Sequence, residues 1–135
     1  MEAKELYAEL ERYFPRNLDL MRHLHIKACW EYIITENSTS EENPKLHYYL
    51  FKKDDKSLEM TQKHPNIKPD LILYFTEKAI LNFIKGNPTA DEYFTRYGEL
   101  MGNPQPGIEI DNQVNKPRLK LWKMGYKDWQ KDFKF

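Results

Sequence analysis

The apolar positions in the first third of the chain change period once, and this change predicts helices followed by a strand. Apolar residues recur at helical spacing over residues 6–14, which predicts a helix that Pro15 ends. Residues 18–24 predict a second, shorter helical segment. Residues 26–35 are rich in aromatic and β-branched residues in alternation, so they predict a strand whose even-numbered residues share one face.

Polar turns divide the rest of the predicted sheet into further strands. Residues 46–53 and 57–62 flank the polar turn 54–56, which predicts an antiparallel hairpin. Residues 70–75 are nearly all apolar, as is typical of a strand near the centre of a sheet. Residues 108–110 predict a further short strand. We therefore expect a sheet of about five strands.

Helix-start signals follow the apolar strand. Thr76 precedes a helical pattern over residues 77–85, and Gly86 stands where helices commonly exit through a left-handed residue. The segment from Thr89 to Glu92 has the form of a capping box. It predicts that a second helix begins there and packs on the sheet through an aromatic stripe.

The last 22 residues form a separate, basic segment. Residues 114–135 contain seven Lys and Arg against two Asp, a charge of 7 − 2 = +5, whereas the whole chain sums to zero. Apolar residues recur there at steps of three and four with lysines between them, which predicts one amphipathic helix. Gly125 in its middle costs about 1 kcal/mol relative to Ala, so tertiary packing must hold the segment. The stripe consists of Leu119, Trp122, Tyr126, Trp129 and Phe133.

Length and composition narrow the class of protein. A chain of 135 residues has room for one domain, so we expect a single domain over residues 1–135. No apolar run approaches the roughly 20 residues that cross a bilayer. The charged amino terminus shows no secretory signal, and a single cysteine, Cys29, cannot form an internal disulfide. These features predict a soluble protein of the reducing cytoplasm.

The order of elements resembles the sterol carrier protein type 2 family. Residues 70–77 look like that family's alternating strand ending in a Ser/Thr-acidic helix start, and residues 85–89 resemble its Gly-centred turn between two helices. Residues 93–100 are similar to its aromatic-then-Gly segment. The resemblance covers about residues 17–103.

Two departures from the family pattern lie after this segment. The family usually continues with a basic strand that closes the sheet, and here any closing strand must begin after Gly107. The basic segment has no place on the family pattern. Both departures affect the mouth and the lining of any cavity.

The resemblance implies a hydrophobic tunnel between the sheet and the helix pair, and non-catalytic carriage of a lipid, fatty acyl chain or sterol-like ligand. Physical chemistry allows this independently, because each buried CH₂ group gains roughly 0.8 kcal/mol and a chain of about ten to sixteen carbons needs no special polar site. The alternative is that the same residues fill a solid core. The candidate lipid-binding residues are Trp30, Tyr32, Tyr49, Phe51, Leu73, Phe75, Ile80, Phe83, Ile84, Tyr93, Phe94, Tyr97 and Met101.

Other chemistry has weaker support. His23 and His25 lack a cysteine or carboxylate cluster that would complete a zinc site. We expect Cys29 to be a buried, inert thiol. The chain has no Gly-x-Ser-x-Gly, Walker or Gly-x-Gly-x-x-Gly sequence. We therefore expect no catalytic residue, cofactor or metal ion.

The basic segment leaves three possibilities open. Its apolar stripe could dock on the open end of the sheet, with the lysines merely solvated. Residues 116–135 could instead lie on an anionic membrane surface, so the second hypothesis is a peripheral membrane or protein-interaction module with a filled core. Nucleic-acid binding has the least support. The predicted fold is α+β, a mixed or antiparallel sheet with helices on one face and the basic helix at the carboxyl end.

Overall fold

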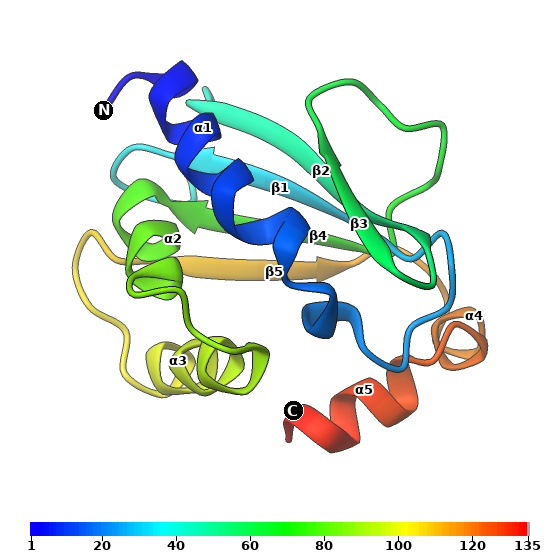
Figure 1. Ribbon diagram of the computed structural model, residues 1–135. Coiled ribbons are helices and arrows are strands. Elements are labelled where there is room, and N and C mark those ends of the chain that lie inside the picture. The colour runs from blue at the N-terminus through cyan, green and yellow to red at the C-terminus, as the bar shows by residue number, and fades with distance from the viewer. Residues whose placement is uncertain (135) are drawn as a thin grey trace.

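The computed structural model describes residues 1–134 and contains a five-stranded sheet (Figure 1). The strands lie side by side in the order β3-β2-β1-β4-β5. β1 and β4 run parallel, and every other neighbouring pair is antiparallel, so the sheet is mixed. The strands are β1 (Cys29–Thr35), β2 (Leu46–Asp54), β3 (Ser57–Thr61), β4 (Leu71–Thr76) and β5 (Ile110–Val114).

Helices cover one face of this sheet, which confirms the predicted α+β class (Figure 1). Among the described helices none is long and apolar enough to span a bilayer. Two short 3₁₀ helices, η1 (Phe14–Arg16) and η2 (Leu18–Met21), follow the first helix. The α-helices are α1 (Ala3–Tyr13), α2 (Glu77–Ile84), α3 (Ala90–Gly102), α4 (Arg118–Lys123) and α5 (Tyr126–Phe133).

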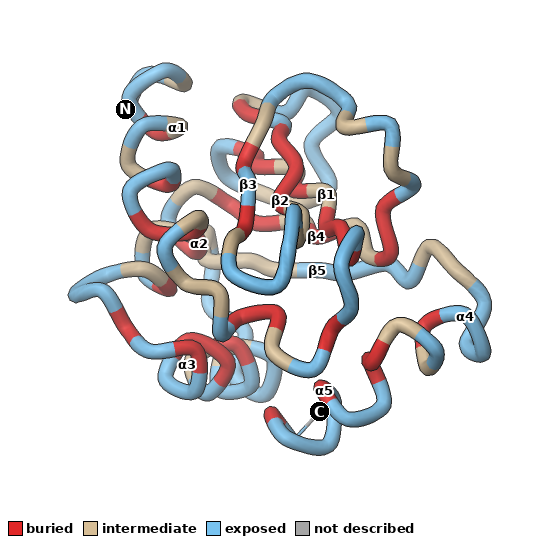
Figure 2. The backbone as a smooth tube through the Cα atoms, turned by 45° about the vertical axis from the view of Figure 1, so that its right-hand side comes forward, coloured by how far each residue is buried: buried red, intermediate tan, exposed pale blue. Residues whose placement is uncertain are grey.

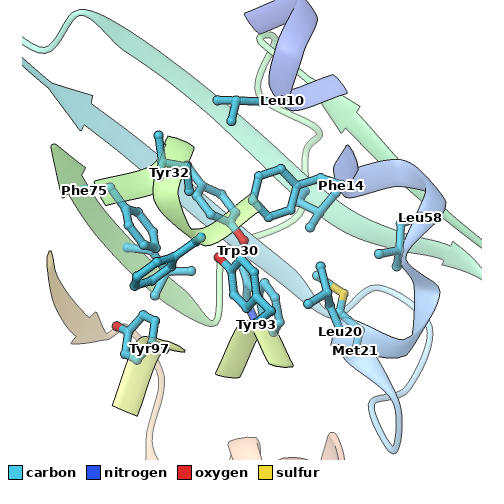
Figure 3. Packing of buried hydrophobic residues seen from close by; sticks show 14 of the residues in the cluster. Leu10, Phe14, Leu20, Met21, Trp30, Tyr32, Leu58, Phe75, Tyr93 and Tyr97 are labelled. Carbon is cyan, nitrogen blue, oxygen red and sulfur yellow. The ribbon is translucent and has the colours of Figure 1, made fainter. Parts of the chain in front are cut away.

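Alternation along the strands places one continuous hydrophobic core between the sheet and these helices. Trp30, Tyr32 and Ile34 of β1 are buried on the helix side, as the pattern predicts. Figure 2 shows the buried positions where the helices meet the sheet, and Figure 3 shows the aromatic rings that fill this layer. The Tyr32 ring stacks on that of Tyr48 across β1 and β2, with centroids 4.6 Å apart. Aromatic rings therefore make up much of the core.

The predicted helix starts are present. The Thr76 side chain accepts a hydrogen bond from the amide of Ala79 at the beginning of α2. At α3 the Thr89 hydroxyl accepts from the Glu92 amide, and the Glu92 carboxylate accepts from the Thr89 amide. This reciprocal pair satisfies donors that a helix end leaves free. It fixes where α3 begins over the sheet.

The carboxyl-terminal region differs in part from the prediction. β5 closes the sheet, and it begins after Gly107 as expected but two residues later than the strand predicted over residues 108–110. A helical segment follows, but it is broken into α4 and α5 at Gly125, whose φ is +101°. A Cβ atom at Gly125 would meet the carbonyl oxygen of His23 at 1.9 Å. The close approach to that backbone, together with the left-handed conformation, explains the break.

Candidate functional site: an apolar pocket beside the carboxyl-terminal helix

A pocket of about 300 Å³ lies on the helix-covered face of the sheet, between β4, β5, α3 and α5. Its floor consists of buried side chains of β1 and β4, among them Trp30, Tyr32 and Phe75. Phe94 of α3 and Trp129 of α5 line its walls. Figure 3 shows Tyr93 and Tyr97 of α3 among the aromatic side chains of this layer.

Two large apolar side chains are exposed at the mouth of the pocket. Met101 at the end of α3 is 51% exposed and Val114 at the end of β5 is 58% exposed, and both line the pocket. Gly98 also lines the pocket, one turn before Met101 on α3, and a Cβ added to it would meet no atom within 4 Å. The missing side chain therefore leaves the mouth open at that point of the helix.

Two side-chain amides also belong to the lining. Asn112 of β5 and Gln130 of α5 line the pocket, and both residues are exposed. The Asn112 side-chain amide donates to the Tyr97 hydroxyl at 3.1 Å. Among the described lining residues none carries a charge.

Burial controls the ionisation of the tyrosines in this layer. Desolvation raises the pKa of both Tyr32 and Tyr93 well above 10, and it also raises the pKa of Tyr97, against the opposing effect of the Asn112 hydrogen bond. The hydroxyls therefore remain protonated and neutral at physiological pH. The described lining suits an uncharged, apolar group.

The wall that α5 contributes is held to the sheet by a buried polar network. The Tyr126 hydroxyl donates to Asp70 Oδ2 at 2.6 Å and accepts from Trp30 Nε1 at 3.0 Å. Lys116 Nζ lies 2.5 Å from the other oxygen of Asp70, which is fully buried. The Trp129 indole donates to the Leu20 carbonyl oxygen at 2.9 Å. Bonds to β1, η2 and the residue before β4 thus position α5 beside the pocket.

Phe94 joins α3 to α5 at the closed end of the pocket. Its ring centroid is 5.3 Å from that of Trp129 and 4.4 Å from that of Phe133. The apolar stripe of the basic segment is thus docked through Tyr126, Trp129 and Phe133, which are buried, and Leu119 is exposed.

The pocket unites eight of the thirteen predicted candidates. They come from β1, β4 and α3, as expected. They are Trp30, Tyr32, Leu73, Phe75, Tyr93, Phe94, Tyr97 and Met101.

The prediction that Tyr49 and Phe51 face the helices was wrong. Tyr49 pairs with Glu31 and Phe51 with Cys29, both on the opposite face of the sheet, so Tyr48 and Leu50 point into the core instead. The ring of Tyr49 contacts that of His64 in the loop after β3. These two aromatics cannot contact a ligand in the pocket.

The three candidates on α2 also lie outside the pocket. Ile80 and Phe83 are buried in the core, where the Phe83 ring contacts Phe75 at 5.5 Å. Ile84 is half-buried in a shallow groove between α1 and α2. α2 therefore supports the sheet without lining the pocket.

Sequence reasoning missed six lining residues, and most of them lie beyond the segment that carries the family resemblance. The apolar stripe of the basic segment did single out Trp129, but as a docking residue. Even-numbered alternation with Ile110 would have identified Asn112 and Val114, had the closing strand been placed correctly. The missed residues are Leu71, Gly98, Asn112, Val114, Trp129 and Gln130.

Residues considered for catalysis or metal binding have structural partners. Within residues 1–134 no group of three or more His, Cys, Asp or Glu could hold a metal ion. His23 Nε2 lies 2.8 Å from Asp132 Oδ2, a contact that joins the segment after η2 to α5. Cys29 is buried, and burial, with a further contribution from Asp70, raises the pKa of its thiol to about 12. At physiological pH this thiol is protonated and not nucleophilic.

The described residues thus form an uncharged, largely apolar pocket, with Met101 and Val114 exposed at its mouth. One wall of the pocket is α5, which hydrogen bonds hold to several other elements. No model of a known protein family matches the sequence, and no curated protein matches it.

Proposed function

We propose that the protein is a non-catalytic carrier that binds a single acyl chain, or an apolar molecule of similar size, in the pocket between α3, α5 and the sheet. The observation that carries this proposal is the pocket itself, about 300 Å³ of space with an uncharged, largely apolar lining. Small-molecule sites range over roughly 300–1,000 Å³, so this one is small. The resemblance to the sterol carrier protein type 2 family supports the same function.

The volume limits the ligand. If a methylene group fills about the 30 Å³ that a water molecule takes in the liquid, the pocket holds on the order of ten carbon atoms. This favours one medium-length chain over a sterol or a two-chain lipid. Each methylene gains roughly 0.8 kcal/mol, so affinity should rise about fourfold per carbon and level off near ten carbons. The single buried cysteine favours a reducing compartment, and we place this carrier in the cytoplasm.

The test is calorimetric titration with octanoate, decanoate and dodecanoate, together with native mass spectrometry of the freshly purified protein. Gly98→Phe should fill the open mouth and lower decanoate affinity at least tenfold, since the added ring enters empty space at the pocket. Gly102→Phe is the matched control, because it adds the same ring one turn later on α3, outside the lining, and should bind as the wild type does.

Both variants remove a helical glycine, so neither should lower the melting temperature through helix propensity. The proposal fails if the wild-type protein carries no extractable lipid and binds none of the three acids. Undiminished binding by Gly98→Phe would place the ligand elsewhere.

A further inference from the structure

Five cations of the basic segment have no salt-bridge partner among the described residues. Arg118, Lys120, Lys123, Lys127 and Lys131 are all exposed. Within residues 1–134 no carboxylate forms a salt bridge with any of them. Because residues 114–135 sum to +5 and the chain sums to zero, the remainder of the chain carries −5. The molecule is therefore electrically polarised.

These cations border the mouth of the pocket. Lys127 and Lys131 stand on α5 on either side of Gln130, which lines the pocket. The Arg118 guanidinium and Lys127 Nζ lie 4.4 Å and 4.9 Å from the centroid of the same ring, that of Trp122. α4 and α5 thus present one cationic cluster, and its α5 members lie beside the pocket-lining Gln130.

Exposed apolar side chains accompany the cluster. Met101 and Val114 line the mouth, and Leu119 of α4 is 70% exposed. Cations combined with exposed apolar groups are typical of protein surfaces that bind the interface of a lipid bilayer. A single-stranded nucleic acid would instead need open aromatic faces on which to stack bases. Arg118 and Lys127 already lie over the half-buried ring of Trp122, and the other described aromatics of the segment, Tyr126, Trp129 and Phe133, are buried in the core.

We propose that the protein docks on anionic lipid bilayers with the mouth of the pocket facing the membrane, through the cationic cluster of α4 and α5 and the apolar side chains Met101, Val114 and Leu119. This inference rests on the proposed carrier function, because it gives the apolar ligand a path between bilayer and pocket that avoids water. The partner is the anionic lipid surface itself.

The test is flotation of the full-length protein with vesicles of phosphatidylcholine, with and without phosphatidylserine. Binding should require phosphatidylserine and weaken with added salt. Each lysine near an anionic surface contributes about a fivefold factor in binding, so Lys127→Glu with Lys131→Glu should reduce binding at least about 30-fold. The matched control is Lys4→Glu with Lys78→Glu, which makes the same charge change on α1 and α2, away from α4 (Figure 1).

The two proposals fail separately in this experiment. The Lys127 and Lys131 double variant should still bind decanoate, whereas Gly98→Phe should still float with anionic vesicles. If the wild-type protein binds decanoate but does not float with vesicles that contain phosphatidylserine, the docking proposal alone is overturned. Equal loss in the control variant, or salt-sensitive binding to a single-stranded oligonucleotide without vesicle binding, overturns it as well.

Discussion

At the scale of single residues, two buried tyrosine hydroxyls of the same core have opposite surroundings. The Tyr48 ring stacks on Tyr32, yet within the described residues its buried hydroxyl has no hydrogen-bond partner. The Tyr126 hydroxyl donates to the Asp70 carboxylate and accepts from the Trp30 indole. A buried hydroxyl without a partner costs about 1–3 kcal/mol, whereas a bond to a charged group contributes about 1.5–3 kcal/mol.

Replacing each tyrosine by phenylalanine should therefore change stability in opposite directions. Tyr48→Phe removes an unsatisfied group and should raise the free energy of unfolding by about 1 kcal/mol. Tyr126→Phe leaves Asp70 and Trp30 each without one bond and should lower it by about 2 kcal/mol. Urea denaturation of both variants measures the difference. A loss of stability in Tyr48→Phe equal to that in Tyr126→Phe would contradict the assignment of partners.

At the scale of elements, the sequence was sufficient wherever one periodicity dominated. The capping residues Thr76 and Thr89 marked the starts of α2 and α3, and alternation in β1 identified its inward face. The inward face of β2 was ambiguous, because aromatic or aliphatic residues occupy both its even-numbered and its odd-numbered positions. His47, which shares a face with Tyr49, was the only polar residue before Lys52 that could have fixed the phase.

The broken carboxyl-terminal helix could not be predicted from periodicity. From Trp122 to Phe133 the apolar residues keep steps of three and four across Gly125. A single left-handed residue adds no position to the sequence, so the pattern does not reveal the break. Only the approach of the His23 carbonyl, which lies 125 − 23 = 102 residues earlier in the sequence, makes the break necessary. The pocket depends on the same contact, because α5 forms its wall only after the turn at Gly125.

Gly125→Ala should therefore be destabilising even though alanine favours helices. The new Cβ would lie 1.9 Å from the His23 carbonyl oxygen, far inside van der Waals contact, and the left-handed backbone adds about 1–2 kcal/mol. We expect the free energy of unfolding to fall by at least about 2 kcal/mol. Gly98→Ala, in the regular part of α3 with open space around it, should raise it by up to about 1 kcal/mol. Thermal unfolding followed by circular dichroism compares the two, and a stable Gly125→Ala protein would argue against this backbone contact.

At the scale of the whole molecule, the pocket depends on contacts between segments far apart in the sequence. Arg22, after η2, pairs with Asp91 at 2.7 Å on α3 and with Asp132 at 2.7 Å on α5, and its guanidinium lies 4.2 Å from the Phe133 ring centroid. One arginine thus fastens together the two helices that form the pocket walls. If the ligand leaves by separation of α3 and α5, this contact also controls its release.

The same contact predicts how stability depends on pH. Hydrogen bonds from His23 and then Arg22 lower the pKa of Asp132, and a hydrogen bond from Arg22 lowers the pKa of Asp91. Both pKa values are lower in the folded than in the unfolded state. The two ionised carboxylates therefore stabilise the folded protein fully above the ordinary carboxyl pKa, and this stabilisation is lost as the pH falls through their pKa values in the folded state. Acidification should therefore release the α3–α5 contact.

Arg22→Met should lower the melting temperature near pH 7 and speed the dissociation of decanoate. The melting-temperature difference from the wild type should shrink as the pH falls through the folded pKa values of the two carboxyls. Arg12→Met is the control, because Arg12 pairs only with Glu9 within α1 among the described residues and exposed pairs of this kind contribute little. A melting-temperature difference for Arg22→Met that persists unchanged at acid pH would show that the arginine acts through its packing on Phe133. Faster decanoate release without any change in melting temperature would mean that the contact holds the pocket walls together locally and contributes nothing to global stability.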